Sequence, residues 1–116
     1  MKSLASISEK DIETIQMALN DSISDINVEL KGTISERKKL ELLDYKEKYS
    51  RVLKKLRQNP SIYALAEFEL DFVAGGLHDA IEMLEECLED DLTEEEKSDI
   101  MTDKNDFQRL LGILAS

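Results

Sequence analysis

The sequence is poor in cysteine, proline, glycine and aromatic residues. Its 116 residues include one Cys, one Pro, four Gly, three Tyr, three Phe and no Trp. The single cysteine, Cys87, excludes an internal disulfide and a zinc site built on cysteines. The scarcity of glycine and proline favours long helices with few interruptions. The few aromatic residues predict a core made mainly of Leu, Ile and Val.

Long hydrophobic runs are also missing. No segment approaches the roughly 20 apolar residues that a membrane-spanning helix requires, and the first six residues are not apolar enough for a signal peptide. We therefore expect a cytoplasmic protein with no membrane partner. In that reducing compartment Cys87 should be a reduced, partly buried residue beside Ala80 and Leu84, because its carboxylate neighbours disfavour a reactive thiolate.

Basic residues are scarce in one part of the chain. Residues 67–106 contain sixteen Asp and Glu but only Lys97 and Lys104 as bases, whereas residues 36–57 contain nine Lys and Arg and four acids. The formal net charge of the sequence is −11. A field of this sign repels nucleic acid and anionic membranes and attracts basic protein surfaces. We therefore expect a basic protein partner and no direct contact with nucleic acid.

The apolar residues recur at helical spacing through most of the sequence, which has the length of one domain. In the first segment they form one stripe: Ile12, Ile15, Leu19, Ile23, Ile26 and Leu30. The pattern predicts an all-α fold, an antiparallel bundle of four to five helices at about 9–31, 34–58, 60–74, 77–90 and 94–114. In this single domain, 1–116, residues 1–7 are expected to be a flexible N-terminus.

Capping residues and glycines define the expected helix ends. Thr33 followed by Glu36, and Thr93 followed by Glu96, are typical of capping boxes. The short link at Gly32 predicts an antiparallel hairpin of the first two helices. The pair Gly75-Gly76 separates two apolar stripes that lie about 100° apart around a straight helix. A break or kink at these glycines would let both stripes face the core.

His78 and Glu82, one helical turn apart, are the best metal candidate in the sequence. Two ligands from one helix do not make a site, so we predict no metal and no cofactor. A phosphotransfer role for His78 is disfavoured because the adjacent Asp79 repels a phosphoryl group. The sequence has no nucleophile elbow and no glycine-rich phosphate loop. We therefore do not expect an enzyme.

Glu69 falls close to the apolar stripe of the expected third helix, between Ile62 and Val73. A desolvated carboxylate with a raised pKa is a common sign of a functional acid. The favoured alternative is that Glu69 lies at the edge of the stripe or pairs with a lysine of the second helix.

Four bases of the second helix share its outer side and could meet phosphates: Arg37, Lys48, Arg51 and Lys55. Glu41 and Asp44 dilute this patch, and the net charge opposes binding to nucleic acid. We expect these bases to pair across the bundle with the acidic helices.

The densest run of acid lies between the last two expected helices: Glu85, Glu86, Glu89, Asp90, Asp91, Glu94, Glu95, Glu96 and Asp99. Such a run is either a solvated face or a docking surface for a basic partner. Phage-borne inhibitors, antitoxins and nuclease-immunity proteins are similar in size and charge, although no motif here identifies any of them.

We therefore predict a non-catalytic acidic inhibitor or regulator that docks on a basic, nucleic-acid-handling protein through these nine residues. The alternative is a structural subunit or adaptor that self-associates, as a homodimer for example, through apolar helix faces. Met17, Val28 and Leu40, which lie off the main stripes, are the candidates for that contact.

Overall fold

The computed structural model describes residues 4–115, and the expected all-α fold is confirmed over this range. The α-helices are α1 (Glu9–Leu30), α2 (Glu36–Gln58), α3 (Glu67–Cys87) and α4 (Glu94–Ala115). Two short 3-10 helices, η1 (Leu4–Ser6) and η2 (Ile62–Ala64), precede α1 and α3.

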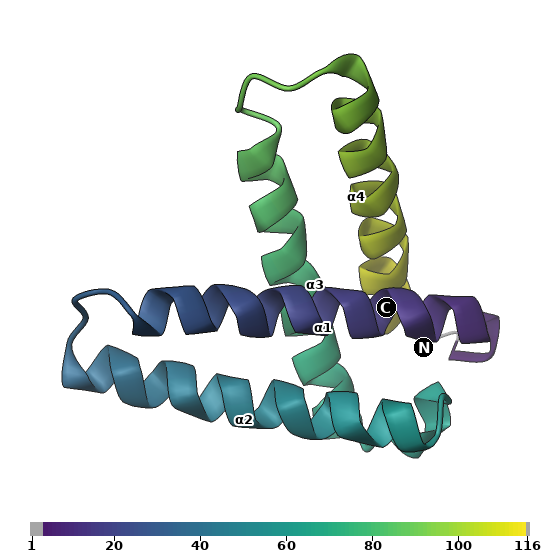
Figure 1. The fold of residues 1–116 in the computed structure, drawn as a ribbon. Coiled ribbons are helices and arrows are strands. Elements are labelled where there is room, and N and C mark those ends of the chain that lie inside the picture. Colours follow the sequence, from purple (N-terminus) through teal and green to yellow (C-terminus); the bar gives the residue numbers. More distant parts are fainter. Residues whose placement is uncertain (1–3, 116) are drawn as a thin grey trace.

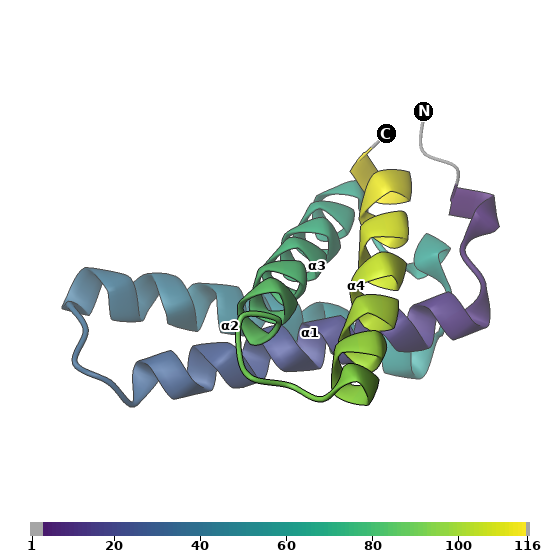
Figure 2. The same ribbon diagram turned by 90° about the horizontal axis from the view of Figure 1, so that it is seen from above.

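The four helices form two antiparallel hairpins that cross each other (Figures 1 and 2). The first hairpin is α1 with α2, as the short link at Gly32 predicts. The second is α3 with α4, and α3 contacts both helices of the first hairpin. The loop between α3 and α4 points away from the first hairpin (Figure 1). The molecule measures 41 × 39 × 25 Å, and the end of the second hairpin that holds the α3–α4 loop projects from the packed region (Figure 1).

Side chains at the helix starts hold the ends of the hairpins. At α1 the Ser8 hydroxyl accepts from the Asp11 N–H, and the Asp11 carboxylate accepts from the Ser8 N–H, a complete capping box. Thr93 and Glu96 make the expected reciprocal bonds at α4. At α2 the capping side chain is Ser35, not Thr33 as expected, because Ser35 accepts from the Lys38 N–H.

The core lies where the hairpins cross and is aliphatic, with Tyr49 and Phe107 as its fully buried aromatic residues. The predicted stripe of α1 supplies Ile12, Ile15, Leu19 and Ile26. In α4 the residues fully buried are Phe107, Leu110 and Leu114, whereas Leu111 is only partly buried. Leu110 follows Phe107 at a three-residue helical step.

The predicted break at Gly75-Gly76 is wrong, because α3 runs through both glycines. A Cβ added to Gly76 would lie 2.8 Å from Cδ2 of Leu19. The Ser22 hydroxyl also donates to the Gly76 carbonyl at 3.1 Å. Gly76 therefore allows α1 and α3 to cross at close range.

The two adjacent glycines give a matched test of this crossing. Gly75→Ala and Gly76→Ala should each gain about 1 kcal/mol of helix propensity. Only the second should meet an overpacking cost of about 1–3 kcal/mol, because Leu19 is fully buried and has little room to move. Urea unfolding followed by circular dichroism should find Gly76→Ala the less stable variant. Equal stabilities would show that close approach at Gly76 is unimportant.

The helix predicted over residues 60–74 is also wrong at its start. Residues 59–66 form a connection that contains η2, with the Ser61 hydroxyl accepting from the Tyr63 N–H. Ile62 and Leu65 are nevertheless buried, so the apolar spacing there reflects a packed connection.

The flexibility expected for residues 1–7 stays a prediction. Leu4–Ser6 form η1, and Leu4 and Ile7 pack against the core. Residues 1–3 lie outside the described range.

Candidate functional site

The nine predicted partner-binding residues occupy the projecting end of the second hairpin, which we call the acidic tip. Glu85 and Glu86 lie in the last turn of α3, Glu89 to Asp91 in the loop, and Glu94 to Asp99 at the start of α4. All nine are exposed. The α3–α4 loop, which carries three of them, lies far from α1 and α2 in Figure 1. The fold therefore gathers the run at one end of the molecule.

Few bases neutralise the acidic tip. Among the described residues, one ion pair reaches it, between Lys97 Nζ and Glu94 Oε1 at 3.9 Å, and Glu94 is almost fully exposed. Glu96 is held by Thr93, whose N–H and hydroxyl both donate to Oε1. The carboxylates beside the N-terminus of α4 also gain from the helix dipole, which offsets part of their mutual repulsion.

A second acidic feature, which we call the acidic cleft, lies where α1, α2 and the middle of α3 meet. It has a volume of about 620 Å³. Its charged residues are five carboxylates and one lysine, with His78 beside them: Asp25, Glu29, Asp79, Glu82, Glu86 and Lys38. Tyr45 and Tyr49 of α2 complete the lining.

Tyr49 and Asp79 link α2 to α3 at the base of the cleft. The Tyr49 hydroxyl donates to Oδ2 of Asp79 at 3.2 Å. Desolvation raises the pKa of Asp79, the Tyr49 hydrogen bond opposes the rise, and the nearby charges of Glu82 and Asp25 add to it. Burial, together with the charge of Asp79, raises the pKa of the Tyr49 hydroxyl. The hydrogen bond from Tyr49 therefore orients the Asp79 carboxylate, which lies near the carboxylates of Glu82 and Asp25.

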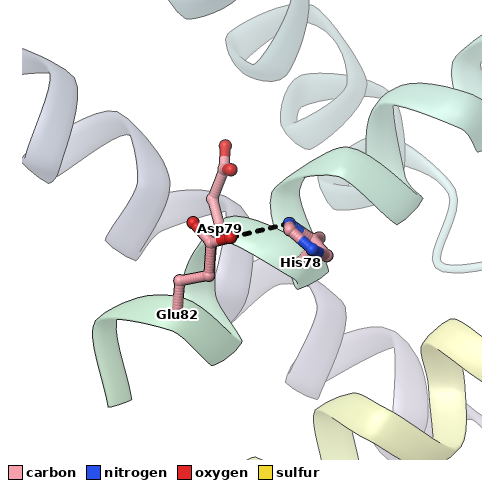
Figure 3. A group of neighbouring side chains, drawn as sticks. All are labelled: His78, Asp79 and Glu82. Carbon is pink, nitrogen blue, oxygen red and sulfur yellow. Dashed lines mark ion pairs between the residues drawn. The ribbon is translucent and has the colours of Figure 1, made fainter. Parts of the chain in front are cut away.

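His78, Asp79 and Glu82 lie together on α3 (Figure 3), and all three line the acidic cleft. Each offers one possible ligand atom, and these atoms are within 4.8 Å of one another. His78 Nδ1 is 3.6 Å from Glu82 Oε1. The structure thus adds Asp79 to the pair that the sequence offered as a metal candidate. All three residues are exposed, as in an ordinary solvated cluster, and the prediction of no metal site stays a prediction.

Glu86 belongs to both the acidic tip and the acidic cleft. Asp79, Glu82 and Glu86 follow each other at steps of three and four, which places them along one side of α3. Carboxylates therefore continue from the cleft to the tip. Asp25, Glu29 and Tyr45 were not predicted to belong to this surface, because they join it only through the crossing of the hairpins.

Glu69 has a structural role, and the raised pKa considered for it is wrong. Its side chain is buried, with Oε1 accepting from Lys55 Nζ at 2.7 Å and from the Ala66 N–H at 2.9 Å. Burial alone raises the pKa, but these hydrogen bonds and the charges of Lys55 and Arg51 outweigh it and leave the pKa below the ordinary 4.5. The favoured alternative, pairing with a second-helix lysine, is confirmed.

The ion pair between Glu69 and Lys55 makes the stability of the fold depend on pH in the acidic range. Because the folded pKa of Glu69 is depressed, its contribution is complete above the unfolded value of 4.5 and is lost as pH falls through the folded pKa. Glu69→Gln should lower the free energy of unfolding at neutral pH by about 1–3 kcal/mol. As the pH falls below that pKa, the Glu69→Gln variant should lose less additional stability than the wild type loses. The control is Glu67→Gln, an exposed neighbour. An unchanged acid dependence in Glu69→Gln would contradict this role.

Three of the four outer bases of α2 do not pair across the bundle, as was expected of them. Arg37, Lys48 and Arg51 form ion pairs with Glu41, Asp44 and Glu47 of the same helix. Within the described residues, Lys55 alone among these four reaches across to α3. The acid at the tip and in the cleft is therefore less neutralised internally than the sequence suggested.

Cys87 is exposed, so its expected partial burial beside Ala80 and Leu84 is wrong. It ends α3, where the chain leaves the core and enters the acidic tip.

Within residues 4–115, no helix combines the length and apolar character that crossing a membrane requires. Comparison of the chain with protein-family models, with curated proteins and with solved structures finds no match.

Proposed function

We propose that this chain is a non-catalytic, cytoplasmic protein-binding module that docks on a basic protein surface. Its role would be that of an inhibitor or regulator, of the kind represented by phage inhibitors, antitoxins and immunity proteins. The observation that carries the proposal is the continuous carboxylate surface of α3 and α4, which runs from the acidic cleft to the exposed acidic tip.

Two physical properties of this surface support the proposal. The first is the low number of compensating bases, which leaves a strong local field that accelerates association with a cationic surface. The second is position: the acidic tip is the projecting end of a hairpin whose other end is anchored in the core by Phe107 and Leu114. A projecting, anchored surface reaches a partner without unfolding the domain.

Proteins that handle nucleic acid offer the matching chemistry. Their binding sites are lined with Lys and Arg that neutralise phosphates. Closely spaced carboxylates along one side of a helix present a comparable density of negative charge. A protein that covers such a site prevents nucleic acid from entering it, which is why we favour inhibition or regulation.

The alternative is a structural subunit that self-associates through apolar helix faces. Exposed apolar side chains close to the α1–α2 loop favour it: Val28 is 66 % exposed and Leu40 is 65 % exposed. Met17, the third candidate, is 40 % exposed. Single exposed apolar residues are normal on a protein surface, so the carboxylate surface carries more weight.

Affinity capture from a lysate of the source cells distinguishes the two functions. The immobilised full chain is used at low and at high salt, beside a Val28→Asp variant, and captured proteins are identified by mass spectrometry. We expect a basic, nucleic-acid-handling protein that is retained by both chains at low salt and released at high salt. Recovery of the chain itself alone, insensitive to salt and lost in Val28→Asp, would instead establish self-association.

A further inference from the structure

The acidic cleft has depth and aromatic surface in addition to charge. Its volume of about 620 Å³ falls within the range of about 300–1,000 Å³ typical of small-molecule pockets. Three helices line it, so its shape depends on the crossing of the two hairpins. An exposed acidic patch on one helix has none of these properties.

The carboxylates of the cleft come from two directions. Asp25 and Glu29 lie on α1, and Asp79, Glu82 and Glu86 lie on α3. Among the residues that the structure describes, Lys38 is the only Lys or Arg in the lining. The charges of Glu82 and Asp25 both act on Asp79, so these groups repel one another across the cleft. A single cation between them would relieve that repulsion.

The aromatic surface comes from α2. The residue Tyr45 is 48 % exposed, and its ring centroid lies 6.0 Å from that of Tyr49. The Tyr49 hydroxyl fixes Asp79 through its hydrogen bond, while Asp79 and Glu82 stand close together (Figure 3). An aromatic face beside oriented carboxylates suits a flat cation, which can stack on the ring and donate to the oxygens.

We propose that the acidic cleft receives the guanidinium group of an arginine side chain from the basic protein partner. This inference rests on the proposed function and names the anchor of the contact. Arginine fits better than lysine because its planar group stacks on rings, donates two parallel hydrogen bonds to a carboxylate and is weakly hydrated. Charge complementarity, ring surface and depth all favour this occupant.

The test uses the isotope-labelled full chain and short capped peptides, with the side-chain signals of Tyr45, Tyr49 and His78 followed by NMR. Gly-Arg-Gly should shift these signals saturably, with at least tenfold tighter binding than Gly-citrulline-Gly, which has the same shape without the charge. Gly-Lys-Gly should bind more weakly than Gly-Arg-Gly.

The double variant Asp79→Asn, Glu82→Gln should weaken arginine binding at least fivefold and preserve an acceptor for Tyr49. The matched double variant Glu95→Gln, Asp99→Asn, confined to the acidic tip, should not weaken it.

Equal shifts with the arginine and citrulline peptides, or shifts confined to the tip, would overturn the arginine site. So would a response of His78 to zinc chloride without any response to Gly-Arg-Gly, which would identify a metal site. A long peptide of alternating Arg and Gly separates this result from the proposed function. If that peptide binds the tip while the cleft signals stay unchanged, the cleft inference fails and the docking function stands. If it binds nowhere, both fail.

Discussion

The triple variant Glu89→Lys, Asp91→Lys, Glu95→Lys should associate with the basic partner at least tenfold more slowly than the wild type. All three residues are exposed and belong to the acidic tip. Fields of this kind raise association rates by about 10–10³-fold, so reversing the field at the contact removes that gain. The rate constant is measured by stopped-flow fluorescence with the partner identified by affinity capture.

The matched control changes net charge by the same amount away from the tip and the cleft. Glu13→Lys, Glu36→Lys and Asp71→Lys together replace three other exposed carboxylates. This control should slow association much less, because exposed charges are screened beyond about 10 Å at 0.1 M salt. Circular dichroism should show both variants folded. Equal slowing by the two variants would mean that net charge, and not the acidic tip, directs docking.

Leu19→Ala should destabilise the fold by about 2–5 kcal/mol, since it removes core volume where α1 and α3 cross. Leu19 is 0 % exposed and faces Gly76, so the structure around it has little freedom to collapse. Leu84→Ala is the comparison. Leu84 is only partly buried against the core, so its replacement should destabilise the fold less than Leu19→Ala does. Urea unfolding followed by circular dichroism measures both. A loss well below about 1 kcal/mol for Leu19→Ala would contradict the assigned core.

The helices could be predicted from the sequence because their signals are local. The stripe from Ile12 to Ile26, the Thr93 cap and the short link at Gly32 each depend on neighbours a few residues away. Length and polarity at that link also determine that α1 and α2 are antiparallel. These elements are all confirmed.

The errors arise where distant residues decide the structure. Gly75-Gly76 reads locally as a helix breaker, but its role depends on Leu19, more than fifty residues earlier in the chain. The ion pairs of α2 are the opposite case, because acids one helical turn away, and not distant acids, pair with Lys48 and Arg51.

The candidate site was predictable in part. The acidic tip is a continuous run, so its residues and their exposure follow from the sequence. The acidic cleft combines Asp25 of α1, Tyr45 of α2 and Asp79 of α3. No spacing rule relates these three positions, because their meeting depends on how the two hairpins cross.

The most direct test of the docking function is the dependence of the wild-type association rate constant on salt. Between about 0.01 M and about 1 M salt the screening length shortens from about 30 Å to about 3 Å. Docking through the acidic tip and cleft predicts that the rate constant falls at least about tenfold across this range, with a smaller change in the dissociation rate constant. An association rate constant that stays level across the same range would contradict electrostatic docking and favour a contact through apolar helix faces.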